Sequence, residues 1–400
     1  NLLWAPYIPV VIETIQRLKK QFWNELTFVL GWQVLTQKKS KTWKVLWLDD
    51  IQFQKLFWEN VYNGMKPWVL ESLLNIKNLS DGHNISLIPM YEKLSDPEFK
   101  EYFSREISLY VSQWCKFDCE FCGAVKNQRL QYRDEEIIYS DLCYITNRLQ
   151  RLWKKSLNIY MSNLDVFQST KKLEWFADMV LQIKKDNPDF TFSIRGLAGT
   201  KSFINLDKNH QQILEKLSKA GFNNVWYGVD GMWPDIWKWI KKPQNNEKEI
   251  LDSIYLSKEK YDMTPELLMV FWHAWVDTET SLKNAYSFVE AMVDKYWAVP
   301  RPHVAKPFIP GSDWWTNPEF QNKIKILIEN PNLFQSLDFT ALASNLTHTD
   351  SAFRSLVNNY YLAMCKLPWN TTLPIIPYDI WDSESDLESK RKENIGKFDR

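Results

Sequence analysis

Glycine is the residue that this sequence most lacks. Its 400 residues include 11 Gly, where an average content of roughly 7% would give about 28. Tryptophan is abundant instead, with 21 residues, so 11 Gly and 21 Trp together make 32. Trp32, Trp297 and the Trp314-Trp315 pair stand in turn-like, polar or strand-end contexts rather than at the periodic positions of a core. Tryptophan therefore occupies positions where glycine is expected.

The sequence also lacks an excess of one charge and a long apolar segment. Lys and Arg total 49, as do Asp and Glu, so the basic surplus typical of nucleic-acid-binding proteins is absent. No uncharged run exceeds 12 residues, whereas a membrane-spanning helix needs about 20. No signal-like segment precedes the fold, and Asn1 is expected to be a fragment edge. The sequence predicts a cytoplasmic protein with no membrane span and no nucleic-acid partner.

Cysteine is scarce but clustered. Of five Cys, three form the pattern C-x-x-x-C-x-x-C at Cys115, Cys119 and Cys122. Thiolates hold iron–sulfur clusters, and a cubane with three protein ligands leaves one iron open. Zinc is the main alternative, but a structural zinc site needs four ligands and no second C-x-x-C exists. The spacing favours an iron–sulfur cluster, and we expect Cys143 and Cys365 to be packing residues.

Strand-like and helix-like segments alternate through the middle of the chain. This alternation predicts parallel strands joined by right-handed crossovers, and six units make a partial (β/α)6 barrel of the TIM type. The expected strands cover 108–114, 157–161, 190–194, 223–229, 266–271 and 301–308, and the expected helices cover 134–152, 171–186, 210–221, 247–261 and 281–296.

The flanking segments differ from this barrel core, which we assign to 106–317. Residues 1–80 show a shorter strand and helix pattern, typical of part of a doubly wound, flavodoxin-like α/β domain. A linker with one short helix is expected at 81–105, a helical extension at 318–378 and a charged, disordered tail at 379–400.

The segment W-C-K-F-D-C-E-F-C-G-A at 114–124 resembles the signature of the radical S-adenosylmethionine superfamily. The resemblance implies that Cys115, Cys119 and Cys122 bind a [4Fe–4S] cluster, flanked by Phe121 and Gly123. In that family the open iron chelates S-adenosylmethionine, and one electron cleaves it to a 5′-deoxyadenosyl radical. The resemblance also implies a small-molecule or peptide substrate and an external electron donor such as a flavodoxin or ferredoxin.

Further segments resemble family motifs at the ends of successive strands. The segment 160–167 corresponds to the second strand end, 192–196 to the third and 225–231 to the fourth, where Asp230 replaces the usual Glu. The segments 270–280 and 306–312 resemble the fifth and sixth, and His273 and His303 beside them are either hydrogen-bonded rim residues or substrate proton donors. The resemblance implies contacts to S-adenosylmethionine from Ser162, Asn163, Asp165, Arg195 and Asp230.

The N-terminal part resembles the later half of the cobalamin-binding domain that precedes many of these enzymes. The segments V-L-G-W-Q-V-L-T at 29–36 and 60–74 carry this resemblance, although the cobalt-ligand motif D-x-H-x-x-G does not occur in the chain. Cobalamin is therefore an additional candidate cofactor, for methyl transfer or rearrangement. The alternative from another class is a non-catalytic iron–sulfur or zinc module that docks a partner.

The family patterns also bear on the tryptophan excess. They expect glycine at Trp32, Trp114, Trp272 and Trp275, where a tight turn or a close approach to a ligand needs a residue without a side chain. Our hypothesis is that the source organism reads UGA as glycine and that the sequence was translated with UGA as tryptophan.

Overall fold

A six-stranded parallel sheet forms the centre of the molecule. The computed structural model describes residues 86–113, 115–122, 130–271, 276–304 and 350–370, the short stretches 28–30 and 61–63, and a few isolated positions. The strands follow one another in chain order across the sheet, and every neighbouring pair is parallel. They are β3 (Glu106–Leu109), β6 (Ser156–Met161), β7 (Thr191–Ala198), β8 (Phe222–Gly228), β9 (Thr264–Phe271) and β10 (Val299–Val304).

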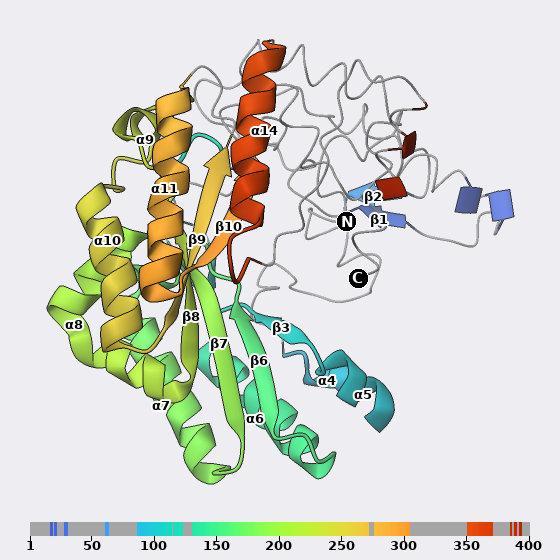
Figure 1. The fold of residues 1–400 in the computed structure, drawn as a ribbon. Helices are drawn as coiled ribbons and strands as arrows, with labels where there is room; N and C mark the ends of the chain where they lie inside the picture. The colour runs from blue at the N-terminus through green and yellow to red at the C-terminus, as the bar shows by residue number, and fades with distance from the viewer. Residues whose placement is uncertain are drawn as a thin grey trace.

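Helices connect successive strands and cover one side of the sheet (Figure 1). Each strand pairs with the next strand of the sheet in chain order, as in the partial (β/α)6 barrel that the alternating pattern predicted. The connecting helices are α6 (Glu135–Arg151), α7 (Thr170–Asp186), α8 (Thr200–Ala220), α9 (Pro234–Trp239), α10 (Glu247–Tyr255) and α11 (Glu279–Tyr296), and α14 (Ser351–Cys365) packs against α11 and β10.

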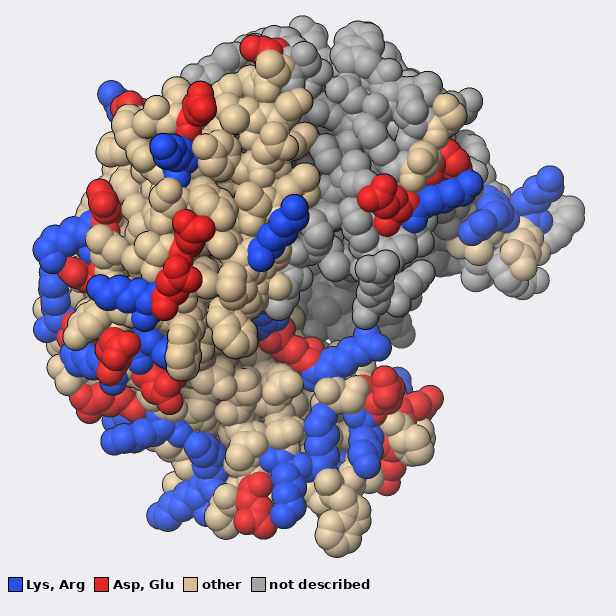
Figure 2. Space-filling view, in the orientation of Figure 1, with Lys and Arg blue, Asp and Glu red and all other residues tan. Residues whose placement is uncertain are grey.

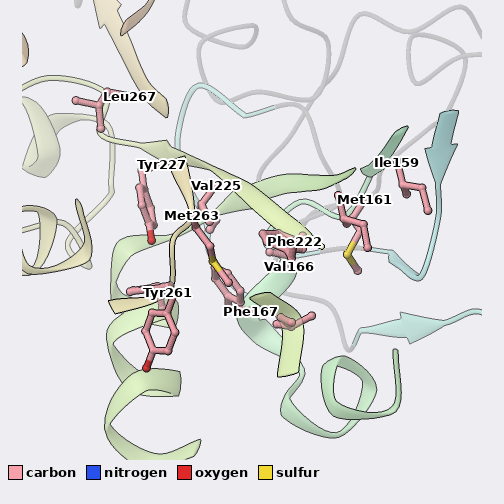
Figure 3. Close-up of a cluster of buried hydrophobic side chains, with 14 of the residues drawn as sticks. Ile159, Met161, Val166, Phe167, Phe222, Val225, Tyr227, Tyr261, Met263 and Leu267 are labelled. Carbon is pink, nitrogen blue, oxygen red and sulfur yellow. The ribbon is translucent and has the colours of Figure 1, made fainter. Parts of the chain in front are cut away.

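The core lies between the sheet and these helices. In β6 the alternate residues Leu157, Ile159 and Met161 are buried, while Asn158 is exposed and Tyr160 half-buried on the opposite, barrel-interior face. Figure 3 shows buried side chains from β6, β8 and the segments beside them gathered in one cluster. Each such side chain contributes roughly 1.5–3 kcal/mol by leaving water. The helix-covered face is therefore the stabilising core, and the opposite face is left polar.

Several boundaries differ from the sequence prediction. The first strand ends at Leu109 rather than 114, and Ser112–Gln113 (β4) instead pairs antiparallel with Gln131–Tyr132 (β5). The third strand continues beyond 194 to Ala198. Helix α8 begins ten residues earlier than predicted, at Thr200, with an irregular turn at His210, and ends on Gly221 in the predicted left-handed cap.

The flanking segments are described only in part. The 81–105 segment contains two helices, α4 (Ile88–Tyr91) and α5 (Asp96–Tyr102), rather than one. In the N-terminal part, β1 (Phe28–Leu30) and β2 (Val61–Asn63) pair in parallel. The assignments for 318–349, most of 1–80 and most of 379–400 lie outside the described residues.

The described surface mixes both charges. Figure 2 shows blue and red side chains interspersed over the helical layer, without a field of one sign. Within the described part of the chain, none of the helices combines the length and apolar character needed to cross a membrane.

Candidate functional site

The cysteine-bearing loop leaves the sheet at the carboxyl end of β3. Two interactions close the base of the loop. The strands β4 and β5 pair with each other, and the backbone N–H of Arg133 donates to the Val111 carbonyl at 2.9 Å. The predicted site residue Asn163 lies beside this base at the end of β6. Its side-chain oxygen accepts from the backbone N–H groups of Val111 and Ser112, both at 3.3 Å, and its amide donates to the Ser112 hydroxyl at 2.9 Å.

These contacts explain why the first strand ends early. The buried Asn163 side chain replaces a neighbouring strand as the partner of the backbone at Val111 and Ser112. The half-exposed Ser162 is also at this edge, where its backbone N–H donates to the Leu109 carbonyl at 3.0 Å. Asn163 is therefore a positioning residue for the cysteine loop, in addition to any contact with a ligand.

The thiols of the loop are partly buried and interact electrostatically. The Cys115 sulfur accepts hydrogen bonds from the Phe117 N–H at 3.4 Å and the Gln168 amide at 3.3 Å. Burial raises the pKa of Cys115 and raises the pKa of Cys119 to about 11, and the neighbouring Cys122 adds to both increases. Without a metal these groups are thus neutral thiols near pH 7, and binding a metal would release protons.

The donor set fits an iron–sulfur cluster with three protein ligands. Among the described residues, no three His, Cys, Asp or Glu side chains already form a group that could hold a metal ion. Nevertheless, three free thiols share one short loop, and thiols are the ligands that iron–sulfur clusters require. The remaining cysteines, Cys143 on α6 and Cys365 on α14, lie on other elements and pack against the core, as predicted.

Asp165 is connected to this loop through Gln168. It is buried and caps the short helix η5 (Val166–Gln168), accepting from the Phe167 N–H at 3.1 Å, the Ser202 hydroxyl at 2.7 Å and the Gln168 amide at 3.2 Å. Burial raises the pKa of Asp165, whereas these hydrogen bonds lower it. Gln168 was missed from the sequence, because its side chain reaches Cys115 only through the η5 turn.

Gly199 passes close to the same carboxylate. A Cβ atom at Gly199 would lie 2.9 Å from the Asp165 Oδ2 atom. Any residue other than glycine at this position would therefore displace the Asp165 carboxylate.

Asp230 lies at the carboxyl edge just beyond β8, as predicted. Its buried carboxylate forms an ion pair with the buried ammonium of Lys242, which also donates to the Gly228 carbonyl at 2.7 Å. Asp230 adopts the left-handed conformation, with φ of 57°, and its N–H donates to the Leu268 carbonyl at 2.9 Å. The sequence analysis missed Lys242, which the turn after α9 returns to this edge.

Lys242 also acts on Cys119. Its positive charge lowers the pKa of Cys119 against the larger effect of burial, and Asp230 acts in the opposite direction. The Gln244 amide lies 3.8 Å from the Cys119 sulfur. Asp230, Lys242 and Cys119 thus form one electrostatically connected group between two strand ends.

Arg195 lies elsewhere than the other predicted residues. It is inside β7 and faces the barrel interior, where its guanidinium binds Glu106, with one contact of 2.6 Å. Its Cζ atom lies 4.1 Å from the centre of the Trp226 ring. The structure therefore separates Arg195 from the carboxyl edge by part of a strand.

A second arginine, Arg301, lies on the other side of Trp226. It binds Glu266 at 2.5 Å, and its Cζ atom is 5.5 Å from the centre of the Trp226 ring. The sequence analysis did not identify Glu106, Glu266 or Arg301, although a glutamate inside the apolar strand β9 is a signal of a polar interior. Together the two arginine–glutamate pairs and Trp226 form a charged layer within the barrel.

The remaining predicted residues are placed as follows. Phe121 is half-buried against the core, and His303 faces the interior on β10 beside Val270. Gly123, His273 and the 306–312 segment lie outside the described residues, as do Trp32, Trp114, Trp272 and Trp275.

A hollow of about 350 Å³ lies outside the cysteine loop. The loop residues Lys116 and Phe117 form one side, and residues of η5 and α8, among them Gln168, Lys201 and His210, form the other. The hollow thus has basic groups beside Cys115.

Comparison with solved structures confirms the fold resemblance expected from the motifs. No protein-family model matches the chain, and a search of curated proteins finds no match. The apo form of the cobalamin-dependent S-adenosylmethionine radical enzyme OxsB matches with a TM-score of 0.50 and 11% identity, over 71% of this chain and 42% of OxsB. OxsB with aqua-cobalamin and S-adenosylmethionine bound gives a TM-score of 0.51 and 12% identity, over 81% and 46%. The chain thus has the same fold and spans less than half the length of OxsB.

The buried Asp230–Lys242 pair should be essential for stability. Removing one member of a buried ion pair leaves an uncompensated charge, so we expect Lys242→Met to lower the free energy of unfolding by about 3–5 kcal/mol. The double variant Lys242→Met with Asp230→Leu should recover part of this loss. Urea unfolding of the four proteins in the double-mutant cycle measures the coupling, and additive losses in the two single variants would contradict a direct pair.

Proposed function

We propose that this chain is a radical S-adenosylmethionine enzyme that binds a [4Fe–4S] cluster through Cys115, Cys119 and Cys122. The observation that carries the proposal is their position: the three-thiol loop lies at the carboxyl edge of a partial (β/α)6 barrel, near Asn163 and Asp230 from the ends of two other strands. Barrel enzymes locate their chemistry at this edge. When bound, such a cluster supplies the electron that cleaves S-adenosylmethionine to a 5′-deoxyadenosyl radical.

The residues around the loop have distinct roles in this proposal. Asn163 and the β4–β5 pair fix the base of the loop, and Gln168 orients Cys115 from the side of Asp165. Lys242 favours the thiolate form of Cys119, which is the form that binds iron. We propose that the Asp230 carboxylate, held by Lys242, accepts hydrogen bonds from the ribose hydroxyls when the ligand binds.

Arg195 is proposed to recognise the carboxylate of S-adenosylmethionine from the barrel interior. Its ion pair with Glu106 and its stacking on Trp226 keep the guanidinium oriented before the ligand arrives. The charged layer around Trp226 would also select a polar substrate, a small molecule or a peptide, in the same interior.

An acidic electron donor fits the outer side of the loop. The hollow beside Cys115 presents Lys116, Lys201 and His210, and complementary charge steers redox partners to such a surface. We therefore propose that a flavodoxin or ferredoxin docks there. Because all five cysteines are free, the compartment proposed is the reducing cytoplasm.

A further part of the proposal is that the chain binds cobalamin. It is supported by the parallel pair β1–β2 in the N-terminal segment and by the shared fold with the cobalamin-dependent OxsB. The alternative of a non-catalytic metal module accounts for the thiols but not for the polar groups at the ends of other strands.

The cysteine assignment predicts a selective loss of iron. After anaerobic reconstitution, wild-type protein should contain about four iron and four sulfide per chain, whereas the variant with Cys115, Cys119 and Cys122 all changed to Ala should contain neither. Cys143→Ala is the matched control and should retain the full iron content. Unchanged iron in the triple variant, or one zinc per chain in the wild type, would reject the assignment.

The role of Arg195 predicts a loss of affinity without loss of the cluster. A charge-assisted contact contributes about 1.5–3 kcal/mol, so Arg195→Ala should weaken S-adenosylmethionine binding at least about tenfold in equilibrium titrations. Arg301→Ala is the control, because Arg301 also pairs with a glutamate and approaches Trp226. This variant should bind S-adenosylmethionine with an affinity close to that of the wild type. Equal affinity of Arg195→Ala and the wild type would disprove the role.

A further inference from the structure

Tryptophan occupies backbone positions that suit glycine. Among the described residues, six non-glycine residues have positive φ, and three of them are Trp153, Trp297 and Trp369, with φ of 61°, 54° and 65°. Two of the others are aspartates, whose short polar side chain tolerates the left-handed region. A bulky aromatic residue is an outlier there, because its Cβ atom is pressed against the following carbonyl oxygen.

Trp153 and Trp297 lie at the end of a helix, and Trp369 lies in the turn that follows one. Trp153 follows α6, and its N–H donates to the Gln150 carbonyl at 2.9 Å. Trp297 is the C-cap of α11, and Trp369 lies in the turn after α14. Helices commonly end on a left-handed glycine, and Gly221 fills this role after α8 with φ of 108°. Two helix ends, and the turn after a third helix, thus carry tryptophan in the left-handed conformation that glycine adopts after α8.

The side chains of these tryptophans contribute little to the core. Trp153, Trp297 and Trp369 are 89%, 63% and 64% exposed, and Lys258 approaches the ring of Trp297 at 5.4 Å on the surface. Trp237 differs from these three residues in its position, burial and hydrogen bonding. It lies within the helix α9, is 5% exposed, and its indole N–H donates to the Val229 carbonyl at 2.9 Å. The described tryptophans therefore include both unburied indoles at helix ends and a packed, hydrogen-bonded aromatic residue.

We infer that Trp153, Trp297 and Trp369 are glycines in the protein that its own cell makes, because that cell reads UGA as glycine. The backbone conformation and exposure carry this inference independently of the proposed function. Composition agrees, since 11 Gly and 21 Trp together reach the glycine content of about 28 expected for this length. The three positions are distinct from Trp32, Trp114, Trp272 and Trp275, for which family patterns suggested the same reading.

The coding sequence and the native protein test this directly. Codons 153, 297 and 369 should be UGA and codon 237 should be UGG. Peptide mass spectrometry of protein from the source cells should find glycine at the first three positions and tryptophan at 237. UGG codons at 153, 297 and 369, or tryptophan in the corresponding native peptides, would overturn the inference.

Stability gives a second, independent readout. In the chain made with tryptophan at all these positions, each of Trp153→Gly, Trp297→Gly and Trp369→Gly should raise the thermal unfolding midpoint by about 2–4 °C, because glycine relieves the strained conformation. The control Trp237→Gly should lower the midpoint, because it empties a packed site. A lower or unchanged midpoint in the three helix-end variants would contradict the inference.

Discussion

The structure depends on one constraint, namely that every neighbouring pair of strands in the described sheet is parallel. Parallel strands joined by crossover helices must all end at the same edge. That edge therefore collects the cysteine loop after β3, Asn163 after β6 and Asp230 after β8, although these residues are far apart in sequence. Helices cover only one face, so the opposite face can hold the polar layer of Arg195, Glu106, Glu266 and Arg301.

Buried charge is the second feature of the edge. Lys242 is held between Asp230 and Cys119 in an environment where burial alone would suppress the thiolate. A lysine beside a thiol acts against that penalty. Desolvation is the larger effect, and the counter-charge of Lys242 reduces it at the residue proposed to lose a proton and bind iron.

Much of the fold could be predicted from sequence, because hydrophobic period and length define a βα unit locally. The four α6 residues predicted to share one face, Ile138, Leu142, Ile145 and Leu149, are all buried. The end of β3 could not be predicted, because it is set by a side chain 52 residues away in sequence, Asn163.

Site residues that directly follow a strand could be predicted from the sequence. Site residues that reach the carboxyl edge of the sheet through a later turn could not. Cys115 and Asp230 are at the predicted edge, whereas Lys242 and Gln168 reach it through the α9 and η5 turns. Arg195 was expected at a strand end, but β7 continues to Ala198 and leaves it in the interior. Strand length depends on pairing with neighbours, which local sequence does not encode.

The central claim is that the thiol loop holds a cluster with an iron open to S-adenosylmethionine. Electron paramagnetic resonance of the reconstituted and reduced protein, recorded with and without S-adenosylmethionine, tests it most directly. The account predicts the spectrum of a single reduced [4Fe–4S] cluster that changes when S-adenosylmethionine is added. A cluster spectrum that is unaffected by saturating S-adenosylmethionine would contradict it.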